Sequence, residues 1–282
     1  SGGRYGRNNS LDLESYMVVP VGAASFGEGA EKCMEVYQAL KRLLTISGYQ
    51  TGVGDDGGFV PDLRNSEEAL EYIMEAMMLC GYEPGKDMCL AIGAGAESLF
   101  DEGTGFYQFK GESRMTGVPV ERDRNDMIGF YIRLLDGYPV CAVFDGLAEA
   151  DAGGWGMLTK MLGNRAVFIG QHKNREPGCL KPGERDWACL ADWDGVEENA
   201  AGISMCGAKS VTAAMEMADL AKRNGLKLAV SQGYGETEDP YAADFAAAVN
   251  ADWIRAGAPC RSERTSKYNE LLRIEEWMKV RI

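Results

Sequence analysis

The sequence is poor in the residues and patterns that mark several common classes of protein. It has a single histidine, His172, and its eight cysteines never form a C-x-x-C pair. One imidazole cannot build a metal cluster by itself, and scattered cysteines do not indicate a zinc site or a disulfide framework. Several cysteines fall inside apolar runs, which is typical of small buried side chains in a reducing compartment. A cytoplasmic location is therefore expected.

Long apolar runs and clustered basic residues are also missing. No apolar stretch approaches the ~20 residues of a membrane span, and no charged-then-apolar signal peptide opens the chain. The net charge is −14, and no basic block is longer than a pair, whereas phosphate binding needs clustered Lys and Arg. We expect neither a membrane nor a nucleic acid as a partner.

The chain does contain amphipathic helical patterns. Residues 28–48 place apolar side chains at i, i+3 and i+4 and end at Gly48, which predicts a helix with a glycine stop. Residues 65–82 repeat this design, with Asn65 or Ser66 as the N-cap and Gly81 at the end. Residues 262–280 form a closing helix in the same way.

Short apolar segments alternate with these helices and predict strands. The segments are 15–22, 87–93, 138–144, 165–170, 199–204, 226–231 and 251–257. Continuous apolar strands between helices favour a parallel sheet that is covered on both faces. A count of about eight fits a closed barrel better than an open sheet. With no interior linker, we predict a single α/β domain over residues 1–282, a TIM-type (β/α)8 barrel.

Four longer segments carry a specific resemblance. They are "GGRYGRNNSLDLESYMVVPVGAASF" (2–26), "GVGDDGGFVPDL" (52–63), "GETEDPYAADFAAA" (235–248) and "GAPCRSERTSKYNELLRIEE" (257–276). In order and spacing they closely resemble the enolase (phosphopyruvate hydratase) family. The resemblance implies the family's C-terminal barrel, which opens with two strands and two helices before regular βα units. The family's smaller N-terminal α+β domain is expected before Ser1 and is absent from this chain.

The resemblance also implies a chemistry, removal of a proton α to a carboxylate, which needs magnesium, a base and an acid. The family's three metal-binding carboxylates correspond to Gly93, Phe144 and Gln171 in this sequence. Magnesium requires hard anionic oxygens. Glycine and phenylalanine offer none, and glutamine offers a neutral one. We therefore expect that the magnesium site is lost and that no cofactor is bound.

The positions of the family's acids and bases have changed as well. The catalytic lysine corresponds to Ser204, and the second active-site lysine corresponds to Arg255, which keeps the charge but cannot act as a base. The two glutamates correspond to Asp56 and Ser15. Glu14 lies beside Ser15, and neighbouring strand residues face opposite ways. A one-residue insertion before it allows a bulge that turns Glu14 into the site, an alternative that stays open.

The residues that hold the substrate in the family differ too. Its His-Arg-Ser run corresponds to Gln232, Gly233 and Tyr234, and the histidine of its opening loop corresponds to Tyr5. A small molecule of unknown identity could still bind in the barrel mouth. The candidate ligand-binding residues are Tyr5, Gln171, His172, Lys173, Gln232, Tyr234 and Arg255.

Three functions remain open at this point. The first is an enolase-like barrel without enolase activity, a pseudoenzyme or binding scaffold. The second is an enzyme with different, metal-independent chemistry in the same mouth. Its further acidic candidates are Asp55, Asp56, Asp145 and Glu149, although for Asp55 and Asp56 we favour a tight glycine turn in which the acids cap backbone amides. The third is a protein-interaction module, with pairing into a homo-oligomer through surface that the small domain would otherwise cover.

Overall fold

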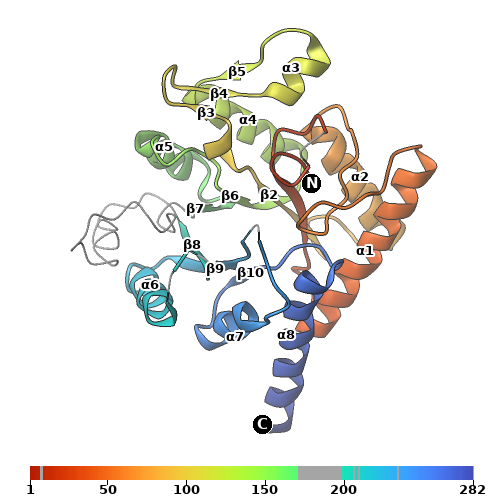
Figure 1. Ribbon diagram of the computed structural model, residues 1–282, viewed down its shortest axis with the longest axis vertical. Coiled ribbons are helices and arrows are strands. Elements are labelled where there is room, and N and C mark those ends of the chain that lie inside the picture. The colour runs from red at the N-terminus through yellow and green to blue at the C-terminus, as the bar shows by residue number, and fades with distance from the viewer. Residues whose placement is uncertain (7–8, 171–198, 206, 209, 234, 282) are drawn as a thin grey trace.

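The protein is built on one curled, mostly parallel β-sheet with helices on its outer side (Figure 1). The computed structural model describes residues 1–281 apart from 7–8, 171–198, 206, 209 and 234. Within them the sheet order is β1-β2-β6-β7-β8-β9-β10. The strands are β1 (Ser15–Val19), β2 (Cys89–Gly93), β6 (Val140–Phe144), β7 (Val167–Gly170), β8 (Ala200–Ser204), β9 (Lys227–Ser231) and β10 (Trp253–Arg255).

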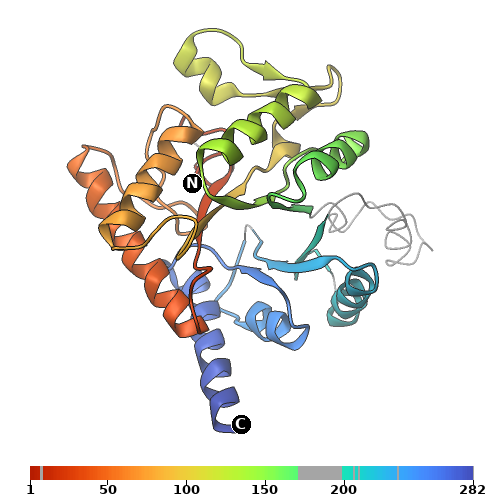
Figure 2. The same cartoon turned by 180° about the vertical axis from the view of Figure 1, so that it is seen from behind.

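All seven segments predicted as strands are confirmed, each as one strand of this sheet. The pairs from β2 to β10 are parallel, and β1 alone runs antiparallel to its neighbour β2. In the described residues, helices connect β2 to β6, β6 to β7, β8 to β9 and β9 to β10, and helices cover the outer face, as Figure 2 shows from behind. The α/β barrel fold class predicted from the sequence is therefore confirmed.

The order at the start of the chain differs from the one expected. The resemblance implies two strands before the first two helices, but the described residues contain only β1 there. Residues 2–6 and 9–14 form turns and bends instead. The Gly2 amide donates to the Glu14 carbonyl (2.9 Å), and Gly3 has a φ of +49°. In the described sheet, β1 lies at one edge and β10 at the other.

The three helices predicted from the sequence are confirmed as α1 (Phe26–Ile46), α2 (Ser66–Leu79) and α8 (Ser262–Arg281). The described residues also contain α3 (Lys110–Thr116), α4 (Arg124–Gly137), α5 (Ala152–Leu162), α6 (Val211–Arg223) and α7 (Tyr241–Ala248). The Asn65 side chain accepts from the Glu68 amide at 2.9 Å, which confirms the predicted N-cap of α2. Gly48 and Gly81 follow α1 and α2 with φ of +83°, a conformation that glycine adopts without strain.

The two faces of the sheet bury side chains of different size, because successive strand residues point to opposite faces. The barrel interior holds mostly small residues: Ala91, Ala142, Phe144, Ile169, Ala200 and Ala229. Larger side chains such as Leu90, Ile92 and Phe168 point outward and pack against the helices. The interior is therefore a filled core, and ligand-binding groups can only stand at its ends.

A second, three-stranded sheet projects between β2 and α4 (top of Figure 1) and was not anticipated from the sequence. It is made of β3 (Phe100–Asp101), β4 (Phe106–Gln108) and β5 (Glu121–Arg122), with α3 beside them. The buried Tyr107 and Phe109 fix it to the main core. The Asp12 carboxylate accepts from the Gly111 and Glu112 amides at 2.7 and 2.9 Å, which ties α3 to the opening loop.

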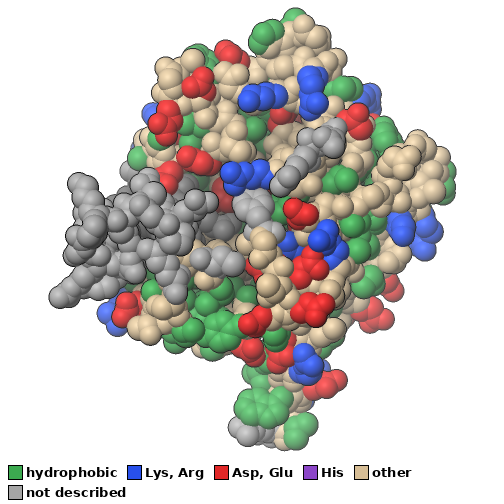
Figure 3. All heavy atoms as spheres, viewed as in Figure 1, with side chains coloured by type: hydrophobic (Ala, Val, Ile, Leu, Met, Phe, Trp, Pro, Cys, Tyr) green, Lys and Arg blue, Asp and Glu red, His purple; other side chains and the backbone are tan. Residues whose placement is uncertain are grey.

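The distribution of charge on the surface and the character of the helices can be compared with the expectation of no nucleic-acid or membrane partner. On the face seen in Figure 3, basic side chains are scattered among acidic ones and form no continuous patch. Among the helices of the described residues, none is both long and apolar enough to cross a membrane. The end of α8 extends away from the body and exposes Trp277, Met278 and Val280 (Figure 1).

Candidate functional site

The candidate site is the mouth of the barrel, where several sequence-predicted residues meet. Gly93, Phe144, Ser204 and Arg255 are the last residues of parallel strands, and Ser15 is the first residue of the antiparallel β1. The strand register pairs Ser15 with Gly93 and Gly93 with Phe144. Because β1 runs the other way, its first residue lies at the same end of the sheet as the last residues of the other strands. The structure therefore brings these five predicted positions to one edge of the barrel.

Arg255 is the central charged group of this mouth. It is only 8% exposed, and its Nη2 donates to the Ser15 hydroxyl at 3.0 Å. Its guanidinium carbon lies 5.4 Å from the centre of the Phe144 ring and 6.0 Å from that of Tyr5. Cations at such distances from an aromatic face are attracted to the ring electrons. The phenyl ring of Phe144 thus packs against a fixed guanidinium.

The electrostatics of the mouth favour this buried charge. Burial acts to lower the pKa of Arg255, but the neighbouring Tyr5, Glu14 and Asp145 raise it, and the net direction is upward. Burial likewise raises the pKa of the Tyr5 phenol. Arg255 is therefore permanently cationic and cannot accept a proton, as predicted for this position.

Gly93 makes the contact between Ser15 and Arg255 possible. A Cβ atom built on Gly93 would overlap the Ser15 hydroxyl and lie 3.0 Å from Arg255 Nη2. Any side chain here, including the family's aspartate, would therefore displace both groups. The glycine at this position matches the shape of its surroundings.

Glu14 lies next to the mouth, directly before β1. It is 4% exposed, and a Cβ built on Gly95 would overlap its carboxyl group, so its side chain packs against the loop that follows β2. It is close enough to Arg255 to raise the pKa of the guanidinium. Ser15 is the residue of this pair whose side chain accepts the hydrogen bond from Arg255.

The two acids of the "GDDGGF" segment lie in a glycine turn. The buried Asp56 carboxylate accepts from the Ser1 hydroxyl at 2.7 Å and from the Gly58 amide at 3.0 Å. Gly57 has a φ of +79°. The Asp55 carboxylate is more than half exposed, and its nearest cation is Arg261 at 3.9 Å. This geometry agrees with the tight turn considered from the sequence, in which Asp56 caps backbone amides.

Gln232 is held by a buried arginine that sequence reasoning did not single out. Arg264 is 1% exposed, and its Nη1 donates to the Gln232 Oε1 at 2.6 Å. Its Nε and Nη2 donate to the Asp55 carbonyl at 3.0 and 2.7 Å. Arg264 therefore links the loop after β9 to the glycine turn. Its presence in "RSER" gave a family signal but no signal of burial.

Ser231 is a second mouth residue that the sequence analysis missed. It is in register with both Ser204 and Arg255, so all three side chains point to the same side of the sheet. Ser231 is 2% exposed, and its hydroxyl has no hydrogen-bond partner among the described residues. Ser204 is 8% exposed and has no histidine beside it within the described residues, since the chain's single histidine lies outside them.

The other candidates fall elsewhere or cannot be placed. Asp145 adopts a left-handed backbone with φ of +51°, directly after Phe144, and Glu149 is half-buried in the following loop. The remaining candidates lie outside the described residues; they are Gln171, His172, Lys173 and Tyr234.

The residues of the mouth do not fit a magnesium ion. At the three family positions, Gly93 and Phe144 supply no oxygen and the third lies outside the described residues. The guanidinium of Arg255 stands against Gly93 and Phe144, where it would repel a second cation. No group of three or more His, Cys, Asp or Glu in the described part of the chain has a metal-binding arrangement.

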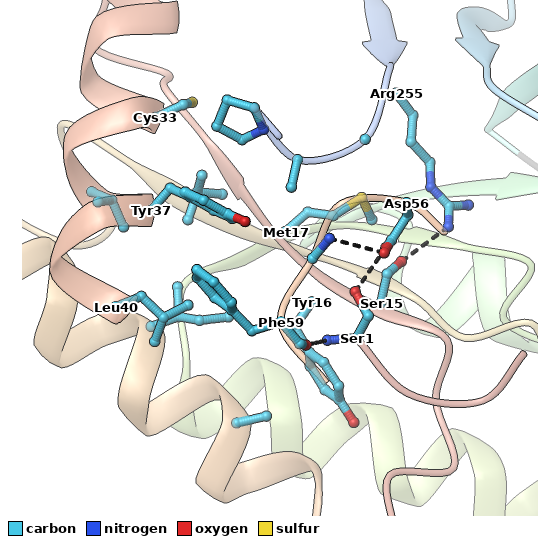
Figure 4. A pocket seen from close by; sticks show the side chains of 18 of the residues that line it. Ser1, Ser15, Tyr16, Met17, Cys33, Tyr37, Leu40, Asp56, Phe59 and Arg255 are labelled. Carbon is cyan, nitrogen blue, oxygen red and sulfur yellow. Dashed lines mark hydrogen bonds between the residues drawn. The ribbon is translucent and has the colours of Figure 1, made fainter. Parts of the chain in front are cut away.

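A cavity adjoins the mouth between α1, β1 and β10 (Figure 4). Its lining is mainly apolar, with Tyr37 and Leu40 from α1 and Phe59 from the loop before α2. Ser15, Asp56 and Arg255 form its polar end, so the mouth and the cavity share these side chains. The cavity beside β1 is therefore part of the candidate site.

The fold agrees with a comparison with known protein families. The model of the "Enolase, C-terminal TIM barrel domain" family matches residues 1–281, nearly the whole chain. The chain therefore belongs to the enolase C-terminal TIM barrel family.

Proposed function

We propose that this barrel has lost the magnesium-dependent dehydration of 2-phosphoglycerate and serves as a pseudoenzyme or binding scaffold. The observation that carries this proposal is the contact of Arg255 with Ser15, Gly93 and Phe144. The Arg255 guanidinium lies beside Gly93 and Phe144, the two residues that we assign to family metal positions. The site needs no metal to balance charge there, and it offers no carboxylate at these positions to hold one.

Two chemical steps of the family reaction lack a suitable group. Proton removal requires a base, and Ser204 cannot take a proton unless another base activates it. Arg255 stays protonated and cannot take over that role. The doubly charged intermediate also needs concentrated positive charge, yet the cations at this mouth are held by protein groups; Arg264, for example, donates to Gln232 and Asp55.

The binding role is supported by the chemistry that remains at the mouth. Arg255 is buried beside a neutral hydroxyl, and the Ser231 hydroxyl, in register with it, has no partner in the described chain. Buried polar groups are normally hydrogen-bonded. A small organic anion would satisfy both groups, and no metal is required for that interaction.

Thermal unfolding with and without millimolar magnesium and 2-phosphoglycerate tests the loss of activity. A ligand at 100 times its dissociation constant adds about 2.7 kcal/mol to the free energy of unfolding, which corresponds to roughly 5 °C for a domain of this size. We expect no shift, and no phosphoenolpyruvate in phosphorus NMR of the same samples.

A magnesium-dependent shift of several degrees would contradict the proposal. Glu14→Gln is the matched control for that outcome, because Glu14 is the buried carboxylate nearest to a family metal position. If Glu14 had replaced a lost ligand, the substitution would abolish the shift. Without a shift, both proteins should melt alike in the presence and absence of magnesium.

A further inference from the structure

Two cysteines from neighbouring strands lie together at the end of the barrel opposite the mouth. Cys89 is the first residue of β2, and Cys141 is the second residue of β6. The Cys141 sulfur lies 3.3 Å from the carbonyl oxygen of Leu90, the residue after Cys89, and the two thiols are in hydrogen-bond contact. Both cysteines are free and partly exposed. The fold thus brings together two thiols that lie far apart in the sequence.

An irregularity in the strand pairing turns Cys141 toward the barrel interior. Leu90 pairs with Val140, and the next pair is Ala91 with Ala142, so Cys141 is an extra residue between the two pairs. Regular alternation would point Cys141 away from the face that holds Ala142. Instead, Cys141 packs with Ala142 in the interior cluster. Such a bulge re-aims a side chain without breaking the sheet.

Cys89 points to the same face. It lies two residues before Ala91, whose side chain belongs to the interior cluster, and side chains two residues apart on a strand share a face. It also pairs with Val19 of β1, which packs against the same cluster. Two independent neighbours therefore place Cys89 on the face to which the bulge turns Cys141.

The composition of the site decides between a metal and a disulfide. Among the described residues, no group of three or more His, Cys, Asp or Glu is arranged to hold a metal ion. A disulfide needs only two thiols in contact, and it forms by exchange when a thiolate attacks the sulfur of another disulfide. Redox chemistry therefore fits this pair better than metal binding does.

The two thiols differ in how readily they ionise. Burial raises the pKa of Cys89, and the hydrogen bond with Cys141 acts to lower it. Burial, together with the neighbouring Cys89, raises the pKa of Cys141 to about 12, against the opposing effect of Lys227 at the start of β9. The thiolate therefore forms first at Cys89, where the Cys141 thiol stabilises it by donating a hydrogen bond.

We infer that Cys89 and Cys141 form a redox-active pair that a low-molecular-weight disulfide, such as glutathione disulfide, converts to an intramolecular disulfide. The Cys89 thiolate attacks one sulfur of glutathione disulfide, forms a mixed disulfide and releases one glutathione thiolate, which takes up the proton lost from Cys89. The Cys141 sulfur then attacks the Cys89 sulfur, gives up its proton and releases the second glutathione. The protein loses two hydrogen atoms, and one glutathione disulfide becomes two thiols.

This pair lies at the other end of the barrel from Arg255, so the inference does not depend on the loss of enolase activity. The test incubates the reduced, folded protein with glutathione disulfide, alkylates the remaining thiols and digests the chain with trypsin. Cys89 is the only cysteine of the tryptic peptide 87–110, and Cys141 is the only cysteine of the peptide 134–160. We expect mass spectrometry to show these two peptides cross-linked, and dithiothreitol to separate them.

Single variants test the order of attack. In Cys141→Ser we expect the mixed disulfide to accumulate at Cys89, because no second thiol displaces the glutathione. In Cys89→Ser we expect roughly tenfold less mixed disulfide at Cys141 after the same time, because this thiol is less often ionised. Cys80→Ser is the matched control: it removes a partly exposed thiol at the end of α2 and should leave the cross-link unchanged.

Circular dichroism before digestion shows that each sample is folded, which excludes random pairing in an unfolded chain. Failure of the folded protein to cross-link peptides 87–110 and 134–160 would overturn the proposal. A cross-link found only in covalent dimers would also overturn it, because the disulfide would then join two copies of the chain. Equal amounts of mixed disulfide in Cys89→Ser and Cys141→Ser would refute the order of attack.

Discussion

Replacing Gly93 by alanine tests whether the mouth is built around the Arg255–Ser15 hydrogen bond. The added Cβ would overlap the Ser15 hydroxyl and approach Arg255 Nη2 to 3.0 Å. Overpacking a well-packed site costs about 1–3 kcal/mol, and loss of a hydrogen bond to a charged group costs roughly 1.5–3 kcal/mol. These costs overlap, because the same displacement causes both. We expect Gly93→Ala to lower the free energy of unfolding by about 2–4 kcal/mol.

The assay is urea unfolding followed by circular dichroism, arranged as a double-mutant cycle with Ser15→Ala. In the Ser15→Ala background the overlapping oxygen is gone, so Gly93→Ala should cost at least about 1 kcal/mol less than it does alone. Gly129→Ala is the matched control: it lies inside α4 with no atom within 4 Å of the added Cβ. It should stabilise the protein by about 0.5–1 kcal/mol. Additive effects of Gly93→Ala and Ser15→Ala, within ~0.5 kcal/mol, would refute the reasoning.

Three other substitutions test contacts away from this glycine. Arg264→Met removes three donors, one of them from the buried Gln232 side chain, and should cost about 3 kcal/mol in urea unfolding, because the Gln232 and Asp55 oxygens lose these partners. Asp151→Asn should cost about 2–3 kcal/mol in the same assay, since the buried carboxylate accepts from the Tyr107 hydroxyl and the Arg124 guanidinium. For Glu275, burial acts to raise the pKa, but hydrogen bonds from amides at the start of α1 lower it overall. The stability that Glu275 adds is therefore present above the unfolded pKa near 4.5 and lost as the pH falls through the folded pKa. Glu275→Gln should therefore weaken the dependence of the free energy of unfolding on pH between about pH 6 and pH 3. Equal pH dependence in the two proteins would contradict this.

Much of the fold could be predicted from the sequence because local chemistry determines it. The spacing of apolar residues predicted the long helices, and Asn65 and Gly81 predicted the two ends of α2. Strand predictions succeeded because strands buried on both faces are short apolar runs. The family was identified from long motifs such as "GETED", which the family comparison confirmed. These signals are each contained in a single segment of chain.

Features that depend on contacts between distant segments could not be predicted in the same way. The strands β3 to β5 are two or three residues long and have no usable period. Nothing in "LKLAVS" shows that Ser231 would lack a partner, because its neighbours come from β8 and β10. The approach of Arg255 to Phe144 likewise depends on the curl of the sheet. The sequence could identify Arg255 and Phe144 as candidate site positions, but only the fold shows that they contact one another.

The motifs that reveal the family form buried contacts between distant segments of this chain. Lys267, from "RSERTSK", is 2% exposed, pairs with Glu236 of "GETED" at 2.9 Å and donates to the Thr237 carbonyl at 2.6 Å. Arg264 connects the same helix to the glycine turn through the Asp55 carbonyl. Removing one partner of a buried ion pair is strongly destabilising. The contacts of these motifs are therefore needed for the fold, so the presence of the motifs supports the fold and carries no argument for the reaction.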